Sequence, residues 1–255
     1  SRVIRPFNHK IAFDFSGMHA VEDYITSRYQ MYMQVYFHPV SRGMEQVLKG
    51  LLARARDCYL GLHGALAIQG PLRLLEPFLK GQWTLEDYLK LDDHVMNAYF
   101  IHWLDEADPV LQDLAYRVIN RKPFKSIITT KEDQEELRLA LYQELFAAGY
   151  NADYYLNDDS SFDLPYDYYR PFHQSNRIQI DLVTKTNQVV ELSQVSSLVH
   201  SLAGQVRGDR RLFFPKELIK HLEQIPADQL NEQQKLILVA YINERNDVTH
   251  NIQER

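Results

Sequence analysis

One short stretch near the start of the sequence has the residue types and spacing that a flat, anionic ligand requires. Tyr24, Arg28, Tyr32 and Tyr36 follow one another at steps of four, which places them on nearly one face of an α-helix. A guanidinium pairs bidentately with phosphate oxygens, and phenol rings pack against a sugar or a base. An internal ion pair of Arg28 beside aromatic core residues fits the same pattern, and periodicity alone favours that second interpretation.

A second group of cationic side chains lies in the segment "QVRGDRRLFF", which contains Arg207, Arg210 and Arg211. An arginine cluster at the beginning of a strand can hold an anionic ligand. Three exposed arginines at a solvated strand edge are the commoner arrangement, and both interpretations stay open at this point.

Motifs for metal binding and nucleophilic catalysis are weak or absent in the sequence. The best cluster of metal-ligating types is Asp92, Asp93, His94 and His102. Its two histidines are eight residues apart, or two helical turns, which is too far to share one ion without other ligands. A polar helix face is the favoured interpretation. There is no glycine-rich phosphate loop and no nucleophile elbow, and Cys58 is predicted to be a buried core thiol.

Composition narrows the possible classes of protein. The chain has 255 residues with a formal net charge of −6, so no basic excess exists to hold a general nucleic-acid partner or an anionic membrane surface. No transmembrane stretch or signal peptide is visible in the sequence. A single cysteine excludes an intrachain disulfide framework and predicts a cytoplasmic protein.

Hydrophobic periodicity predicts a chain that is helical in its first half and mixed in its second. Up to about residue 122, amphipathic patterns with cap signals predict almost only helices, beginning with residues 17–39 and a second helix capped by Ser41. From about residue 123, strands alternate with helices. The predicted strands include residues 123–130, residues 150–159 and a pair around the turn "KTNQ", which is followed by a helix capped by Ser193.

Residues 17–45 and 85–127 carry a resemblance to a known family. They resemble the segment that follows the catalytic core in HD-domain deoxynucleoside triphosphate (dNTP) triphosphohydrolases, in particular bacterial HD-superfamily phosphohydrolases related to the mammalian dNTP-degrading enzyme. In that family an arginine is followed eight residues later by Tyr-x-His, as Arg28 is followed by Tyr36 and His38 here. A looser similarity resumes over residues 174–215.

The resemblance implies a fold class and a division of the chain. The fold class is mainly α with a C-terminal α+β part: a helical HD-domain-type lobe, then a small β-α-β region and C-terminal helices. The implied division is residues 1–122 as a helical lobe that completes the HD catalytic domain, residues 123–215 as an α+β subdomain, and residues 216–255 as C-terminal helices.

The resemblance also implies roles for individual residues. Arg28 matches an arginine that contacts the substrate triphosphate, Tyr36 matches an aromatic residue beside the nucleoside, and Tyr32 occupies a polar position on the sugar side. This reverses the preference for Arg28 in favour of a ligand contact. His38 and, in the loosely aligned part, Arg210 or Arg211 match positions near a regulatory nucleotide site. Pro39 replaces a lysine of the mammalian relative, which weakens the regulatory assignment.

One departure from the family pattern dominates the functional expectation. The family binds its divalent metal through a His, a His-Asp pair and a later Asp, and all of these lie before the segment that begins here. The chain has no initiator Met and begins with an apolar run, so we expect it to be the C-terminal part of such an enzyme. We therefore expect this chain to be inactive alone, with the metal bound by residues outside it.

The expected partners follow from the same resemblance. They are a dNTP substrate, a dNTP activator and further copies of the chain, since the family forms tetramers. An alternative interpretation is a non-catalytic regulatory or assembly module that binds nucleotide or a partner subunit. A third interpretation is a helical scaffold without a ligand, which an internal ion pair of Arg28 would favour.

Overall fold

The computed structural model describes residues 3–163, 180–202 and 207–253. The chain divides into two compact units, each assembled from separate stretches of the sequence. The first comprises Ser1–His38 and Ser160–Asp209, and the second comprises Pro39–Asp159 and Arg210–Arg255. The division predicted from the sequence consists of three consecutive segments, residues 1–122, 123–215 and 216–255. Each compact unit of the structure instead combines two stretches that are separate in the sequence.

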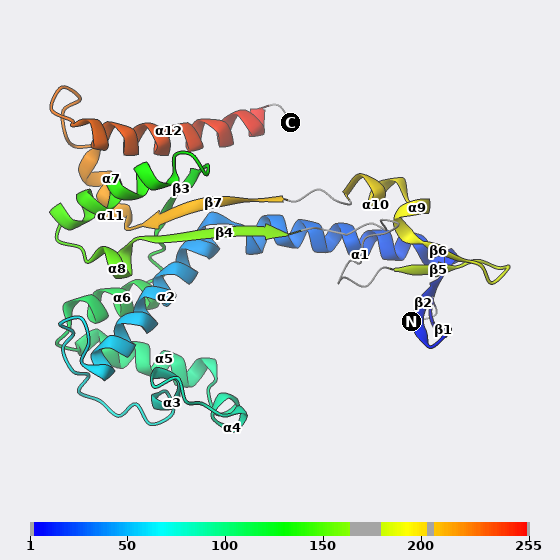
Figure 1. The fold of residues 1–255 in the computed structure, drawn as a ribbon, viewed down its shortest axis with the longest axis horizontal. Coiled ribbons are helices and arrows are strands. Elements are labelled where there is room, and N and C mark those ends of the chain that lie inside the picture. Colours follow the sequence, from blue (N-terminus) through cyan, green and yellow to red (C-terminus); the bar gives the residue numbers. More distant parts are fainter. Residues whose placement is uncertain (1–2, 164–179, 203–206, 254–255) are drawn as a thin grey trace. The chain divides into compact units, whose positions relative to one another are not determined.

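The first unit is built around a small sheet with the strand order β1-β2-β5-β6 (Figure 1). Its strands are β1 (Ile4–Phe7), β2 (Lys10–Asp14), β5 (Asp181–Val183) and β6 (Val189–Glu191). The β1–β2 hairpin turns through Asn8 and His9, which both have positive φ values (48° and 60°), as the twist of a two-residue hairpin requires. Strand β2 then pairs in parallel with β5, so the start of the chain and residues near 182 form one sheet.

The first unit also contains several helical segments. They are η1 (Phe15–Gly17), α1 (Met18–Met31), the π-helix η2 (Tyr32–Tyr36), α9 (Leu192–Val195) and α10 (Ser197–Leu202). Val21 and Ile25 of α1 pack with Leu182, Leu192 and Val199 in one buried cluster. These residues fix the face of α1 that points inward and therefore also the face that points to solvent.

The second unit is organised around one long helix, α2 (Pro39–Leu60). The helices that accompany it are α3 (Glu76–Leu79), α4 (Leu85–Leu89), α5 (Asp93–His102), η3 (Trp103–Asp105), α6 (Pro109–Ile119), α7 (Gln134–Ala147), α8 (Ala152–Tyr155), α11 (Lys216–Leu222) and α12 (Glu232–Gln253). Val47, Leu51 and Ala55 of α2 are fully buried against α5, η3 and α6. This helical cluster is the largest core of the chain.

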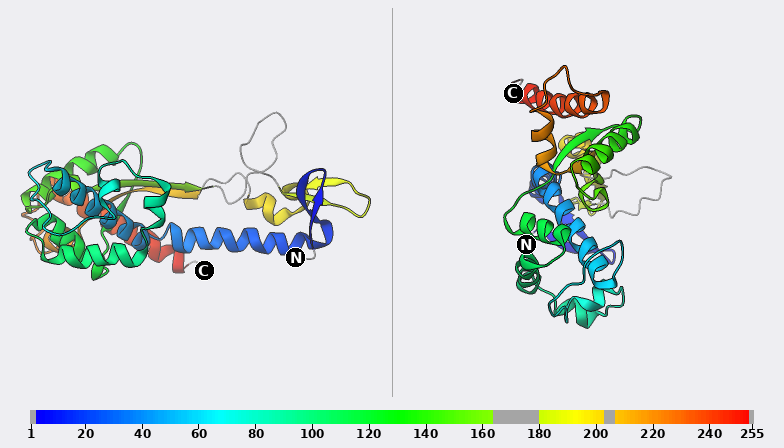
Figure 2. Two further views of the ribbon diagram at one scale, coloured as in Figure 1. Left: turned by 90° about the horizontal axis from the view of Figure 1, so that it is seen from below. Right: turned by 90° about the vertical axis from the view of Figure 1, so that its left-hand side faces the viewer.

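A second sheet, with the order β3-β7-β4, separates two cores in this unit (Figures 1 and 2). Its strands are β3 (Lys125–Thr129), β4 (Asn157–Asp163) and β7 (Arg207–Phe214). Successive side chains of a strand point to opposite faces: Phe213 packs into the α2 cluster, whereas Leu212 and Phe214 pack with α7, α11 and α12. Since both faces of β7 are covered, its sequence is continuously apolar there.

Two glycines allow α2 to lie against the backbone of neighbouring elements. A Cβ atom on Gly43 would lie 2.5 Å from the carbonyl oxygen of Phe124, and one on Gly50 would lie 2.5 Å from that of Tyr154. The two glycines are seven residues apart, so they share one helical face. Any other residue at either position would force α2 away from β3 or α8.

The structure confirms the predicted fold class, which is mainly α with an α+β part. Three local predictions were wrong. Helix α2 already begins at Pro39, so Ser41 lies inside its first turn and is not its N-cap. Residues 151–156 begin with the short helix α8 before strand β4 starts at Asn157, because Asn151 caps a helical turn by accepting from the backbone N–H of Asp153. The helix near Ser193 is capped by Glu191 instead, whose carboxylate accepts from the Ser193 N–H.

We predict that Gly50→Ala lowers the free energy of unfolding by roughly 1–3 kcal/mol, the usual cost of forcing extra volume into a packed interior. Urea titration followed by circular dichroism measures this change. The neighbouring substitution Lys49→Ala is the control, because Lys49 is exposed on the same helix. Equal stability of the two variants would contradict the close approach of α2 and α8.

Candidate functional site

The three residues predicted to contact substrate form one cluster at the end of α1. The guanidinium carbon of Arg28 lies 4.9 Å from the ring centroid of Tyr32, and Nη2 of Arg28 is 3.3 Å from the Tyr32 hydroxyl. The rings of Tyr32 and Tyr36 lie 5.0 Å apart between centroids. A cation over an aromatic face is attracted by the ring quadrupole, so Tyr32 holds Arg28 in a defined orientation.

A local change of helix type alters the ridge that the sequence predicted. The α-helix stops at Met31, and residues Tyr32–Tyr36 form a π-helix in which the N–H of Phe37 donates to the carbonyl oxygen of Tyr32 over 2.8 Å. This wider turn moves Tyr36 off the regular step of four, but its ring still contacts that of Tyr32. Single π-turns inside helices are rare and frequently occur at functional sites.

Arg28 and Tyr32 lie on the same side of the helix as the buried Val21 and Ile25, one to two turns further along, and the cluster exposes aromatic surface through Tyr36. Tyr36 is 55% exposed, while Arg28 and Tyr32 are half-buried. Tyr32 also contacts the ring of Phe37 edge-on. An exposed ring beside an oriented guanidinium can stack on a base or sugar while the cation pairs with phosphate oxygens.

The residues predicted to bind a regulatory nucleotide lie in different places. His38 is exposed at the end of the first unit, two residues beyond the π-helix. Arg210 and Arg211 belong to β7 in the second unit. The side chain of Arg207 lies outside the described residues. No described contact brings these three predicted residues together.

Arg210 and Arg211 differ in their surroundings. Arg211 is 6% exposed; its Nη1 donates to Ser126 Oγ over 2.9 Å and is paired with Glu244 of α12. Glu244 in turn accepts from the backbone N–H of Ile128. Arg211 therefore connects β7 to β3 and α12. Arg210, which pairs with Thr129 across the strands, is half-buried and is more exposed than Arg211.

A cavity that sequence reasoning missed lies within the first unit. It has a volume of about 540 Å³ and is lined by the end of the β1–β2 hairpin and by the turn between β5 and β6. Arg5, whose Nε is 3.0 Å from Asp14 Oδ1, and the exposed Lys185 supply positive charge, while the half-exposed ring of Phe15 supplies a flat apolar wall. No sequence motif predicts this cavity, because its residues come from the two separate stretches of the first unit's sequence. Only the parallel pairing of β2 with β5 brings them together.

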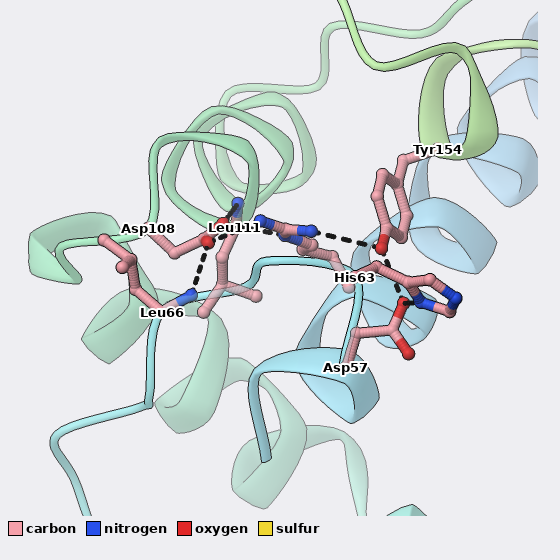
Figure 3. A network of polar contacts seen from close by, with 7 residues as sticks. Asp57, His63, Leu66, Asp108, Leu111 and Tyr154 are labelled. Atoms are coloured by element: carbon pink, nitrogen blue, oxygen red, sulfur yellow. Dashed lines mark hydrogen bonds and ion pairs between the residues drawn. The ribbon is translucent and has the colours of Figure 1, made fainter. Parts of the chain in front are cut away.

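The second unit contains a buried polar network centred on Asp108 (Figure 3). The Asp108 carboxylate is bonded by Nε and Nη2 of Arg54 at 2.9 and 2.7 Å. It also accepts from the backbone N–H groups of Leu111 and Leu66. Arg54 further donates to the hydroxyl of Tyr154 over 3.1 Å. One carboxylate thus joins α2, α6 and the segment that follows α2.

The network continues from Tyr154 toward the surface. The Tyr154 hydroxyl donates to Asp57 Oδ2 over 2.5 Å, and Nδ1 of His63 lies 3.1 Å from the same oxygen. Figure 3 shows His63 and Tyr154 converging on this carboxylate. Burial raises the pKa of Tyr154, and its bond to Asp57 adds to that shift. The phenol therefore stays protonated as a donor, which suits a structural bridge.

Opposing effects act on the ionised pair at the centre of the network. Burial by itself raises the pKa of Asp108, but the bonds from Arg54, Leu111 and Leu66 outweigh burial and hold that pKa below its usual range. Burial likewise disfavours the charge of Arg54, whose pKa is nevertheless raised by its bonds to Asp108 and Tyr154. Both groups remain charged and mutually satisfied, which is typical of a structural pair.

The described residues provide no metal site and no activated thiol. No group of three or more His, Cys, Asp or Glu side chains in the described part of the chain is placed to hold a metal ion. Asp92 caps α5 by accepting from the N–H of Val95, as a polar helix terminus does.

Burial raises the pKa of the Cys58 thiol to about 12, so this thiol is not a nucleophile near neutral pH.

None of the helices within the described ranges has both the length and the apolar character that crossing a bilayer requires.

The comparisons with known proteins find a longer relative in sequence and two solved structures of similar fold. No protein-family model matches the chain. It is 44% identical over 218 residues to the uncharacterised protein YwfO of Bacillus subtilis, in a match that covers 86% of this chain and 50% of the relative. The chain therefore spans about half the length of the curated relative that it matches.

Two solved structures share the fold. A phosphohydrolase from Bacteroides thetaiotaomicron is similar with a TM-score of 0.65 and 22% identity, over 84% of this chain and 54% of that one. A hypothetical protein from Aquifex aeolicus is similar with a TM-score of 0.51 and 20% identity, over 86% of this chain and 48% of that one. The chain therefore shares its fold with part of this Bacteroides thetaiotaomicron protein.

We predict that Asp108→Ala lowers the free energy of unfolding at pH 7 by about 3–5 kcal/mol, because it leaves the Arg54 charge buried without its partner. The pKa of Asp108 is depressed in the fold, so its contribution is present above the unfolded pKa of about 3.9 and is lost as pH falls through the folded value. Urea titrations from pH 7 to pH 3 should show this acid loss in the wild type and less of it in the variant.

The control for this experiment is Glu45→Ala, which removes an exposed carboxylate from the same helix as Arg54. It should keep both the stability and the acid dependence of the wild type. If Asp108→Ala is as stable as this control, the network does not hold the second unit together.

Proposed function

We propose that this chain is part of a dNTP triphosphohydrolase, which converts a dNTP and water into a deoxynucleoside and triphosphate. The chain supplies contacts to the substrate. The observation that carries the proposal is the cluster at the end of α1, where Arg28 is oriented over Tyr32 beside the exposed ring of Tyr36. The phosphohydrolase-like fold supports it.

Each residue of the cluster has a role in this proposal. Arg28 pairs with oxygens of the triphosphate and offsets the charge that these oxygens carry in the transition state. Tyr32 orients Arg28 and contacts the sugar through its hydroxyl. Tyr36 packs against the nucleoside, for which its exposed ring is suited. These groups bind and position substrate, and none of them generates the attacking water.

The attacking water is the part of the chemistry that this chain does not supply. The resemblance assigns a divalent metal that activates water to residues outside the chain. The described residues do not offer a donor set that fits such an ion, so no step here is assigned to it. The proposal for this chain is therefore limited to binding: the substrate at the α1 cluster and, separately, an activating dNTP at His38 of the first unit or at Arg210 of the second.

We predict that Arg28→Ala, made in the natural protein that contains this chain, lowers kcat/KM for dNTP hydrolysis by roughly 10²-fold or more, since a charged contact to the reacting phosphates is lost. Thermal stability should change little, because Arg28 is half-buried and its described partner is on the same helical segment. Release of triphosphate and deoxynucleoside from each dNTP measures the effect.

Two matched variants make the result interpretable. Arg28→Lys keeps the charge but loses the bidentate geometry, so its activity should fall between those of the wild type and Arg28→Ala. Lys10→Ala removes an exposed cation elsewhere in the first unit and should behave as the wild type. A large loss of stability with normal specific activity in Arg28→Ala would show that Arg28 is structural.

The cavity of the first unit favours a second candidate function, which is nucleotide binding without catalysis. Arg5 is paired with the lining carboxylate of Asp14, while the exposed Lys185 and the aromatic wall of Phe15 suit an anionic ring-bearing ligand. This candidate requires only the 255-residue chain and no metal. It corresponds to the regulatory module that the sequence left open.

We predict that a fluorescent dNTP analogue binds the 255-residue chain and that Lys185→Ala weakens its binding by about tenfold, the effect of losing one exposed phosphate contact of about 1.4 kcal/mol. Fluorescence anisotropy measures the affinity. Lys10→Ala is again the control. If Arg28→Ala abolishes binding and Lys185→Ala leaves it unchanged, the nucleotide binds at the α1 cluster and the cavity has no such role.

A further inference from the structure

Helix α7 has large apolar side chains on two opposite faces. Its inner face, which includes Leu137 and Leu141, is buried in the core that it shares with β3, β7 and α12. Its outer face shows Leu139, Tyr142 and Phe146, which are 57%, 48% and 74% exposed. These three positions are separated by three and four residues, which is the spacing of a helix that packs against another helix.

An apolar groove runs between α7 and α12 beside this outer face. It has a volume of about 520 Å³, and its apolar lining includes Leu139 of α7 and Val239 of α12. The two helices are antiparallel, because Glu144 near the end of α7 accepts from Gln234 near the start of α12 over 3.0 Å. A groove between two packed helices accommodates the apolar face of a third helix.

Carboxylates lie at both ends of this groove. Glu136 and Glu232 line its opposite ends. Glu136 is exposed, and the ion pairs of the described residues do not include it. At the other end, Glu144 accepts from the side-chain amide of Gln234, and Lys235 is paired with Glu232 over 2.8 Å. Lys235 is the one cation among the described residues that line the groove, so carboxylates outnumber cations there.

This charge distribution decides which kind of partner suits the groove. A second copy of the chain would bring carboxylates close to carboxylates, and an anionic membrane surface or a nucleic acid would be repelled for the same reason. A partner with lysines or arginines pairs with these carboxylates instead. The pair of Lys235 with Glu232 gives way at little cost, because Glu232 is 91% exposed and such surface pairs contribute little.

We propose that the groove between α7 and α12 binds a cationic amphipathic helix of another protein. The apolar side chains of this helix pack on Leu139 and Val239, and its lysines or arginines pair with Glu136 at one end and with Glu144 and Glu232 at the other. Glu136 and Glu144 are two helical turns apart, about 12 Å along α7. The bound helix therefore carries cations about two turns apart, with apolar residues between them.

Two synthetic peptides test the charge of the partner. Each has about 15 residues, enough to span the groove as a helix, and leucines spaced three and four apart. One carries lysines on both flanks of the leucine stripe, and the other carries glutamates at the same positions. Fluorescence anisotropy should show that the lysine peptide binds the 255-residue chain at least roughly tenfold more tightly, and that added salt reduces the difference. Equal affinities would overturn the proposal.

A matched pair of charge variants separates the groove from general attraction to an acidic protein. Glu136→Lys and Glu45→Lys replace exposed carboxylates and change the net charge equally, but only Glu136 lines the groove. Glu136→Lys should weaken binding of the lysine peptide by roughly tenfold, because it places like charges together. Glu45→Lys should change it little. Equal effects of the two substitutions would overturn the proposal.

A second pair of variants tests the apolar part of the contact. Leu139→Ser and Leu89→Ser each remove an exposed leucine, at 57% and 75% exposed positions. Only Leu139→Ser should weaken binding of the lysine peptide, by roughly tenfold, and circular dichroism checks that both variants fold. If Leu139→Ser leaves peptide binding unchanged but alters the sedimentation of the chain without peptide, a second copy occupies the groove and the proposal is overturned.

Discussion

The carboxylate of Asp108 is the constraint on which the second unit depends. It is buried, it caps α6, it holds the backbone after α2 through Leu66, and it neutralises the Arg54 charge in the middle of α2. A buried charge is tolerated only when its bonds are complete, so these elements have to be placed together. Tyr154 then links the same network to α8 and, through Asp57, to the surface.

The substrate contacts proposed for Arg28, Tyr32 and Tyr36 rest on a different set of constraints. In the first unit, Val21 and Ile25 hold α1 in an apolar core, and Arg28 and Tyr32 continue the same side of the helix one to two turns further along, where they are half-buried. The π-turn that follows brings Tyr32 against both Arg28 and Tyr36. The described contacts of these three side chains are thus with one another and, for Tyr32, with Phe37.

Arginine side chains in the two units differ in how deeply they are buried and in the groups that they contact. Arg54, Arg117 and Arg211 are almost fully buried, and each is matched by carboxylates from other elements. Such arginines stabilise the arrangement of helices and strands. Arg28 is only half-buried, and its guanidinium lies over the ring of Tyr32. Residue type alone does not distinguish these surroundings, whereas burial does.

The sequence by itself determined the helical character of the first half, the alternation of strands and helices in the second, and the neighbourhood of Arg28 with Tyr32 and Tyr36. These features depend on local periodicity and on steps along one helix. Only the tertiary structure decided that Arg211 is buried against Glu244, that Arg5 and Lys185 line one cavity, and that α7 and α12 share an exposed apolar face. These depend on strand pairing and helix packing between residues far apart in the chain, which no local pattern encodes.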